Sequence, residues 1–285
     1  MKLVRFGPSG QEKPGVLDSQ GRVRDLAGHI SDWTSSSLAP SSLEQVNKLD
    51  IRALPLVGQD VRLGPPVANV GKFVCIGLNY SDHAAESGMA GPAEPVVFMK
   101  ATSAISGPND DVVLPRGSTK GDWEVELGVV IGKHAKYVTE EEALSHVAGY
   151  CVVNDLSERA FQLEGTGQWV KGKSADTFGP IGPWLVTPNE VPDPHALHLW
   201  LEVDGHRYQN GNTRTMIFRI PFLIAYLSRF MSLQPGDIIS TGTPPGVGLG
   251  LKPPTYLRAG QRIRLGIEGL GQQEQKVVAE NGLTK

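Results

Sequence analysis

Cysteine is scarce in this 285-residue chain, and no run of apolar residues approaches the roughly 20 that a membrane-spanning helix needs. The two cysteines, Cys75 and Cys151, lie in apolar, strand-like runs, so we expect two buried free thiols in a reducing compartment. Met1 leads directly into Lys-Leu-Val-Arg-Phe without a long apolar run, which predicts no signal peptide. These absences favour a cytoplasmic protein with no membrane partner.

The chain also lacks a strong net charge. Its formal net charge is −3 at pH 7, which gives no electrostatic reason to expect a nucleic acid or an acidic membrane as partner. Hydrophobic residues make up 40% of the chain and charged residues 20%, which is ordinary for a globular protein with a proper core. The 34 glycines and 21 prolines are both above average, and they predict many turns and therefore many strands.

The order of the sequence patterns suggests two domains. Residues 2–6 and 15–26 have the pattern of short strands, and a helix capped by Ser41 follows them. A glycine–proline turn then marks a boundary. We therefore expect a small α+β domain over residues 1–65 and a larger, strand-rich domain over residues 66–285.

The larger domain alternates strand signals with tight turns. We expect strands over residues 73–78 and 95–100, a capping box at Thr139, a hairpin turning at Asp204-Gly205, a helix over residues 220–231 with Pro221 in its first turn, and a last hairpin over residues 261–278.

One apolar, β-branched run, Val125 to Ile131, predicts a largely buried strand. Glu124 and Glu126 open this strand, and residues two apart on a strand point to the same face of the sheet. Like charges repel there unless something positive holds them, and a hard divalent cation is the simplest candidate. The alternative is a solvated pair at a fraying strand entrance.

A third carboxylate, Asp155, ends the apolar strand predicted over residues 149–153. Because Glu124 and Glu126 begin their strand where Asp155 ends another, the three could meet at a sheet rim. Three carboxylates with no histidine or thiolate nearby in sequence favour Mg²⁺, Mn²⁺ or Ca²⁺ over zinc. A Mg²⁺ held by three side chains keeps positions open for water or substrate oxygens.

Three further features could carry chemistry, and each has a plainer interpretation. His83 and Glu86 are three apart, so the carboxylate could orient the imidazole for proton abstraction, or the two could form an ordinary surface pair. Lys173 lies on a predicted loop, where a solvated lysine is the plainer interpretation. Residues 241–243 could offer N–H and hydroxyl groups to an anionic oxygen, or could simply form a turn.

Taken together, five motifs resemble the fumarylacetoacetate hydrolase superfamily over residues 73–271. The motifs are Gly77-Leu78-Asn79-Tyr80 with His83, Trp123-Glu124-Val125-Glu126-Leu127, Val153-Asn154-Asp155-Leu156-Ser157, Gln168-Trp169 with Gly172-Lys173-Ser174, and Pro235-Gly236-Asp237 with Thr241-Gly242-Thr243-Pro244. The resemblance implies an α+β, predominantly β fold: a β-roll catalytic domain preceded by a small N-terminal α+β domain, usually as a homodimer.

The resemblance also implies roles for individual residues. The implied ligands of Mg²⁺, or of Mn²⁺ or Ca²⁺ in its place, are Glu124, Glu126 and Asp155. The implied catalytic residues are Lys173 and, as a dyad on a mobile lid, His83 and Glu86. The implied substrate-binding residues are Tyr80, Gln162, Thr241, Gly242 and Thr243.

Two positions depart from the family pattern. Glu158 is an acid where small residues are usual, and Ala175 stands where an aromatic residue is common. We expect neither departure to touch the proposed metal ligands, and we expect both to bear on substrate choice.

The resemblance implies a divalent-metal-dependent hydrolase that cleaves a carbon–carbon bond in a 2,4-diketo acid of the acylpyruvate type, giving pyruvate and a carboxylic acid. The same site chemistry would serve a ureidoglycolate lyase, or a decarboxylase or isomerase of 2-oxo acids, and the sequence does not choose between them. A metal-binding, non-catalytic assembly protein is the alternative outside enzymes. Such a protein would not need His83, Glu86 and Lys173 beside the carboxylates.

Overall fold

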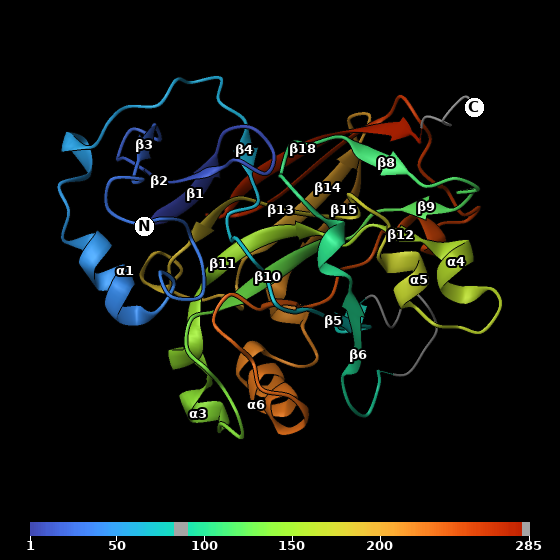
Figure 1. Ribbon diagram of the computed structural model, residues 1–285. Helices are drawn as coiled ribbons and strands as arrows, with labels where there is room; N and C mark the ends of the chain where they lie inside the picture. The colour runs from blue at the N-terminus through green and yellow to red at the C-terminus, as the bar shows by residue number, and fades with distance from the viewer. Residues whose placement is uncertain (83–90, 281–285) are drawn as a thin grey trace.

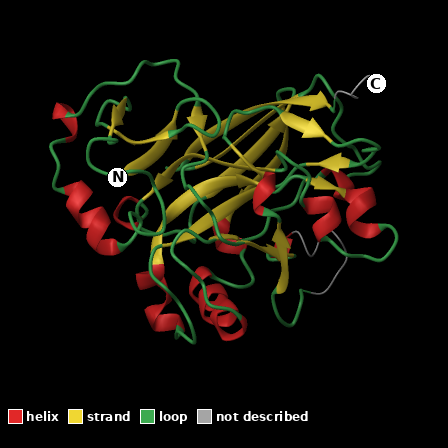
Figure 2. Ribbon diagram, in the orientation of Figure 1, coloured by secondary structure: helices red, strands yellow, loops and turns green. Residues whose placement is uncertain are grey.

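The computed structural model describes residues 1–82 and 91–280 of the chain (Figure 1). Long, curved strands run through the middle of the molecule, and short helices lie at its periphery (Figure 2). Strands outnumber helices in these residues, so the predicted α+β, predominantly β class is confirmed.

The largest sheet contains eleven strands of the described residues. Its order is β3-β2-β1-β13-β11-β10-β16-β5-β6, with β4 beside β1 and β7 beside β13. The strands are β1 (Lys2–Phe6), β2 (Lys13–Leu17), β3 (Val23–Asp25), β4 (Leu63–Gly64), β5 (Phe73–Gly77), β6 (Val96–Lys100), β7 (Ile105–Ser106), β10 (Val125–Ile131), β11 (Val147–Asn154), β13 (Gly179–Val186) and β16 (Ile238–Ser240).

A second sheet has the order β15-β14-β17-β18-β8, and β9 and β12 form a separate two-stranded ladder. These strands are β8 (Val112–Leu114), β9 (Gly121–Asp122), β12 (Ser157–Glu158), β14 (His198–Val203), β15 (His206–Asn212), β17 (Arg262–Ile267) and β18 (Gly271–Ala279). Both predicted hairpins are confirmed. Asp204 and Gly205 join β14 to β15 with φ of +51° and +79°, the left-handed values that a tight two-residue hairpin turn needs.

The core explains why the central strands have apolar sequences. Every residue of β10 and β11 is buried, because apolar clusters cover both faces of the large sheet. Val129 packs in one cluster, whereas its neighbour Val130 packs in the other with Cys151. Cys75 and Cys151 are both free and buried, as expected. Rigid packing on two faces fixes the ends of β10 and β11, where the candidate site lies.

Five helices are described: α1 (Pro40–Asn47), α3 (Glu140–Ala143), α4 (Arg159–Leu163), α5 (Val170–Lys173) and α6 (Ile220–Phe230). The capping box at Thr139 and the position of Pro221 in the first turn of α6 are confirmed. The cap predicted for α1 is wrong, because Ala39 is the N-cap residue and Pro40 begins the helix. Within the described ranges, no helix is long and apolar enough to cross a membrane.

The N-terminal strands continue the large sheet. Strand β1 pairs antiparallel with β13, with Leu3 opposite Leu185. The N-terminal ammonium donates a hydrogen bond of 2.6 Å to the hydroxyl of Thr187, just after β13. The division of the chain into two domains near residue 65 stays a prediction. The first strands of the chain share one sheet with the strands that carry the candidate site.

Candidate active site

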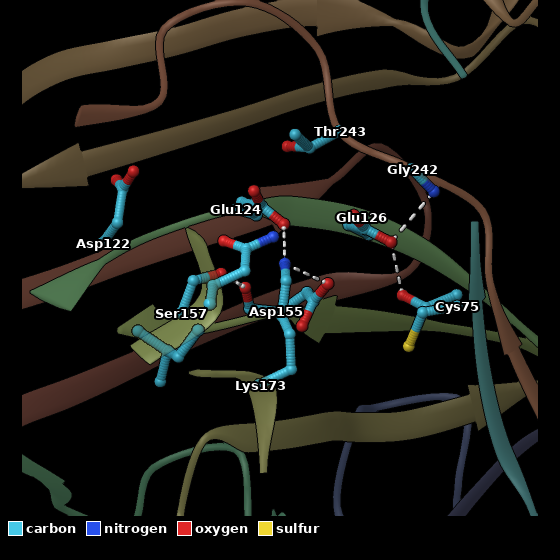
Figure 3. Close-up of polar contacts among 12 residues, drawn as sticks. Cys75, Asp122, Glu124, Glu126, Asp155, Ser157, Lys173, Gly242 and Thr243 are labelled. Carbon is cyan, nitrogen blue, oxygen red and sulfur yellow. Dashed lines mark hydrogen bonds and ion pairs between the residues drawn. The ribbon is translucent and has the colours of Figure 1, made fainter. Parts of the chain in front are cut away.

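The pairing of β10 with β11 brings distant carboxylates together. In this antiparallel ladder Val125 lies opposite Asn154, so Glu124 and Asp155 are adjacent, and the amide of Asp155 donates to the carbonyl of Glu124 at 2.9 Å. Oxygen atoms of Glu124, Glu126 and Asp155 all lie within 4.8 Å of one another, and the three residues are buried (Figure 3). The rim of carboxylates expected from the sequence is therefore present.

A cavity of about 540 Å³ opens beside these carboxylates. Its polar lining comes from Glu124, Glu126, Arg159, Gln162, Lys173, Thr243 and Lys252. Its apolar lining comes from Ile76, Leu78, Phe98, Leu163, Trp169, Val247 and Leu249. A mostly apolar pocket with a few convergent polar groups is the usual form of a small-molecule site.

Lys173 is not the solvated loop residue that one interpretation of the sequence suggested. It ends helix α5, its side chain is 2% exposed, and its ammonium lies 2.7 Å from both Glu124 and Asp155. Helix α5 reaches this depth because Gly172 packs directly on α4. A Cβ at Gly172 would lie 2.5 Å from the backbone nitrogen of Gln162, so only glycine fits there.

Arg159 is a site residue that the sequence interpretation missed. Its guanidinium donates to Glu124 at 2.5 Å, to Asp122 at 2.8 Å and to the amide oxygen of Gln162 at 2.9 Å. Its neighbour Glu158 does not touch the carboxylate cluster and instead caps α4, as expected for that departure from the family pattern. The sequence signal that could have identified Arg159 is its position three residues before Gln162, one of the predicted substrate-binding residues.

Lys100 was also missed. It ends β6, its side chain is fully buried, and its ammonium lies 2.5 Å from Asp155 and 2.9 Å from the carbonyl of Leu156. Burial lowers the pKa of Lys100, and Asp155 opposes that shift. The sequence signal was a lysine at the end of an apolar strand. A lysine buried at such a position rarely lacks an acidic partner, so it points to a nearby carboxylate.

The three carboxylates differ in their electrostatics. Burial alone would raise the pKa of Glu124, but Lys173 and Arg159 outweigh it and hold the pKa at about 2. Burial raises the pKa of Glu126 well above its usual range, and the charges of Asp155 and Glu124 add to the effect. Among the described residues Glu126 has no ion-pair partner. One of its oxygens accepts hydrogen bonds from Ser240 at 2.6 Å and from the amide of Gly242 at 2.9 Å.

This arrangement fits a divalent cation. The donor set contains only oxygen. Glu126, which has no ion-pair partner among the described residues, lies beside Glu124 and Asp155, which share Lys173. A cation bound here would relieve the repulsion that raises the pKa of Glu126. The chemistry of the donors therefore agrees with Mg²⁺ or Mn²⁺ better than with zinc, which favours nitrogen and sulfur.

The loop after β16 supplies less to the cavity than expected. The hydroxyl of Thr241 donates to the carbonyl of Leu127 at 2.9 Å, and the amide of Gly242 is used by Glu126. Of these loop residues, Thr243 alone lines the cavity, and its hydroxyl donates to the carbonyl of Val125. The loop thus fixes the position of Glu126, and its contacts to substrate stay a prediction.

The remaining predicted site residues differ in their relation to the cavity. Gln162 lines the cavity and is 3% exposed. Tyr80 is fully buried, and among the described residues it is not part of the cavity lining and its hydroxyl has no hydrogen-bond partner. His83, Glu86 and most of the lid that the family resemblance implies lie outside the described residues.

Comparisons with known proteins agree with this architecture. A family model described as fumarylacetoacetate (FAA) hydrolase C-terminal matches residues 72–278. A relative from Burkholderia multivorans, whose name gives no substrate, is 65% identical over 276 residues, 96% of this chain and 98% of the relative.

Two solved structures extend the likeness. Fumarylacetoacetate hydrolase from Exiguobacterium antarcticum is 36% identical over 98% of this chain and 100% of its own, with a TM-score of 0.88. Maleylpyruvate hydrolase from Sphingobium sp. SYK-6, solved with a manganese(II) ion and pyruvate, is 31% identical over 99% of this chain and 100% of its own, with a TM-score of 0.83. The chain belongs to the fumarylacetoacetate hydrolase family.

Proposed function

We propose that this protein is a divalent-metal-dependent hydrolase that cleaves the carbon–carbon bond of a 2,4-diketo acid to give pyruvate and a carboxylic acid. The observation that carries the proposal is the all-oxygen cluster of Glu124, Glu126 and Asp155 beside the cavity of about 540 Å³. The manganese and pyruvate held by the maleylpyruvate hydrolase from Sphingobium support it by likeness.

The three carboxylates would hold the cation, with Mg²⁺ as the first candidate and Mn²⁺ and Ca²⁺ as alternatives. When bound, the cation would supply Lewis-acid polarisation of the carboxylate and 2-oxo oxygens of the substrate. The hydrogen bonds from Ser240 and Gly242 hold Glu126 in place for this role.

Basic and amide groups at the cavity would stabilise the negative charge that develops on the departing pyruvate fragment. Lys173 lines the cavity and, because Asp155 and Glu124 outweigh the effect of burial, keeps a raised pKa and thus its charge. Arg159 binds the amide oxygen of Gln162, which leaves the NH₂ group of that amide to donate to a substrate oxygen. Preorganised donors of this kind are commonly worth about 10²–10³-fold in rate each.

The proton transfer is assigned to His83, with Glu86 as its orienting partner. His83 would take a proton from water, the resulting hydroxide oxygen would bond to C4, and the C3–C4 bond would break. The proton ends on C3, so the products are pyruvate and the carboxylic acid derived from the acyl group.

Turnover of acetylpyruvate by the purified protein with Mg²⁺ or Mn²⁺ tests the proposal. We expect pyruvate and acetate in equal amounts, no reaction after chelation, and no reaction in Glu126→Gln. Parallel assays with oxaloacetate and ureidoglycolate separate a decarboxylase, which releases CO₂, and a lyase, which releases urea. A change in ultraviolet absorbance of an unsaturated 2-oxo acid without cleavage would identify an isomerase instead. Metal binding without turnover of any of these acids would favour a non-catalytic protein.

A further inference from the structure

Strand β10 loses its strand partner on one edge before it reaches the carboxylate cluster. The ladder of β10 with β16 ends at the pair of Gly128 and Ser240. The next contact along this edge comes from Thr241, whose amide and hydroxyl both donate to the carbonyl of Leu127. Val125 follows on the same edge, and its N–H and C=O are bonded by side chains instead of by a strand.

Gln209 and Thr243 close a ring of hydrogen bonds on the peptide groups of Val125. Gln209 lies on β15 and is fully buried. Its amide oxygen accepts from the N–H of Val125 at 2.9 Å, and its NH₂ group donates to the hydroxyl of Thr243 and to the carbonyl of Pro244, both at 2.8 Å. The hydroxyl of Thr243 donates in turn to the carbonyl of Val125 at 2.9 Å. Because buried peptide groups without partners are strongly disfavoured, this ring fixes the backbone at Val125.

Backbone groups set the direction of each hydrogen bond in the ring. The N–H of Val125 can only donate, so the oxygen of the Gln209 amide faces it. The carbonyl of Pro244 can only accept, so the NH₂ group faces the carbonyl and, beside it, the hydroxyl oxygen of Thr243. The hydroxyl proton of Thr243 then points to the carbonyl of Val125. The ring therefore needs a donor and an acceptor in the side chain at position 209 and a hydroxyl at position 243.

Close packing holds β15 against the loop that carries Thr243. A Cβ at Gly211 would lie 2.4 Å from the side chain of Pro244, and a Cβ at Gly246 would lie 2.0 Å from the carbonyl oxygen of Tyr208. Only glycine fits at these two positions, so the hairpin and the loop have little freedom to move apart. The second sheet, to which β15 belongs, is in this way joined to the edge of β10.

The backbone of Val125 matters to the metal site because it lies between Glu124 and Glu126. A shift of this backbone would move both carboxylates at once. Mg²⁺ binds oxygen at about 2.0–2.1 Å in near-ideal octahedral geometry, which leaves little tolerance for such a shift.

We propose that Gln209 is a positioning residue for the metal site. Through Val125 and Thr243 it holds the backbone between Glu124 and Glu126, so that the two carboxylates keep the spacing that a divalent cation needs. Gln209 is not among the described residues that line the cavity, so it acts only through its neighbours. The inference rests on the metal site of the proposed function and adds to that site a residue from the second sheet.

Titration calorimetry of the metal-free protein with Mn²⁺, without any substrate, tests the inference. Gln209→Met keeps a similar volume but cannot form the ring, and we expect it to bind Mn²⁺ about 10-fold more weakly, as is typical for groups that orient metal ligands. Thr243→Val should weaken binding by a similar factor. Thr243→Ser keeps the hydroxyl and should bind within about twofold of the wild type. Because no substrate is present, a role of Thr243 in substrate binding would not change these affinities.

The ring should behave as one unit. Gln209→Met combined with Thr243→Val should bind Mn²⁺ little more weakly than either single variant, because each change alone already opens the ring. Independent effects would multiply to a loss of about 100-fold, and that result would overturn the inference.

A matched control separates positioning from loss of stability. Gln273 on β18 is 1% exposed, and its amide donates to the carbonyls of Val152 and Gly182 and accepts from Gln275. Gln273→Met should lower the unfolding temperature much as Gln209→Met does, but should keep Mn²⁺ affinity within about twofold of the wild type. Equal losses of affinity in the two variants, or unchanged affinity in Gln209→Met, would overturn the inference. If Gln209→Met does not fold, equal affinities of Thr243→Val and Thr243→Ser would overturn it.

Turnover of acetylpyruvate distinguishes this inference from the proposed function. Mn²⁺ affinity that depends on the ring, with no pyruvate released by the wild type, would contradict the proposed function and leave the role of Gln209 standing. Release of pyruvate, with unchanged Mn²⁺ affinity in Gln209→Met, would overturn the role of Gln209 and leave the proposed function standing. A wild type that binds no Mn²⁺ would overturn both.

Discussion

The ammonium of Lys173 lies 2.7 Å from a carboxylate oxygen of Glu124, although the two residues are 49 positions apart in the chain. The same ammonium lies 2.7 Å from Asp155, so one lysine partners two of the three carboxylates at the cavity. Positive charge already holds part of the cluster, and the remaining carboxylate, Glu126, has hydrogen bonds but no ion pair among the described residues. The stability of the site should therefore depend on both the lysine and the metal.

Removing Lys173 should destabilise the protein most strongly when metal is absent. Loss of one partner of a buried ion pair typically costs about 3–5 kcal/mol, so Lys173→Met should lower the free energy of unfolding by about 3 kcal/mol in the presence of a chelator. Added Mn²⁺ should stabilise the variant more than the wild type, because the cation replaces the missing positive charge. Urea unfolding with chelator and with Mn²⁺ measures both effects, and equal stabilisation by metal in the two proteins would contradict the prediction.

Metal binding should release a proton from Glu126. Burial raises the pKa of this carboxyl well above its usual 4.5, and the charges of Asp155 and Glu124 raise it further. The proton must leave before the carboxylate can bind a cation, so affinity for Mn²⁺ should increase as pH rises from about 4.5 through the raised pKa. Calorimetry in buffers with different ionisation enthalpies counts the protons released. A pH-independent affinity with no proton release would refute the assignment.

The same raised pKa has a consequence for the metal-free protein. A carboxyl whose pKa is higher in the folded state favours folding most below its unfolded pKa, and that contribution is lost as pH rises through the folded pKa. Glu126→Gln cannot ionise, so the variant should lack this part of the pH dependence. Chemical unfolding of both proteins over that pH range, in the presence of a chelator, provides the comparison.

Asp122 should matter for both stability and substrate binding. Its buried carboxylate accepts hydrogen bonds from Arg159, Gly248 and Leu249, so it joins the cluster to the loop of residues 247–252 at the cavity. Asp122→Asn should lower the free energy of unfolding by about 2 kcal/mol, because hydrogen bonds to a charged group are lost or weakened. KM for a diketo acid should rise more than kcat falls, and steady-state kinetics with thermal unfolding would reveal it. A variant with normal KM would show that the loop keeps its position without Asp122.

The sequence predicted the carboxylate cluster because its signal is local. Acidic residues at the ends of apolar strands are unusual, and antiparallel pairing of β10 with β11 is enough to bring Glu124 and Asp155 together. Hairpins with Asp-Gly turns and helices with capping boxes were predictable for the same reason. The expected cap at Ser41 failed because Pro40 already begins the helix, and proline is well suited to a first helical position.

The basic residues around the cluster could not be placed in the same way. Lys173, Arg159 and Lys100 reach the carboxylates through α5, α4 and β6, and two of these elements are helices of only four and five residues. No periodic pattern identifies helices this short, and the contacts depend on close packing such as that of Gly172 on Gln162. A buried acidic cluster does require nearby cations, but charge balance alone does not say which lysines and arginines supply them.

The proton-transfer pair gives the last prediction, which rests on the sequence because His83 and Glu86 lie outside the described residues. If His83 activates water, His83→Ala should lower kcat for hydrolysis of a diketo acid by about 10²–10⁴-fold, the usual range for general-base catalysis. Binding of Mn²⁺ should survive, because neither residue belongs to the carboxylate cluster. Decarboxylation needs no attacking water, so any decarboxylation of oxaloacetate should suffer less than hydrolysis.

The double variant sharpens the comparison. Residues that act as a unit lose activity non-additively, so His83→Ala combined with Glu86→Ala should be little worse than His83→Ala alone. Steady-state rates for both substrates in the wild type and the three variants test this together. Equal losses in hydrolysis and decarboxylation would assign His83 to substrate binding. Full retention of hydrolysis would leave the two residues as an ordinary helix-surface pair, because a general base cannot be removed without slowing the step that needs it.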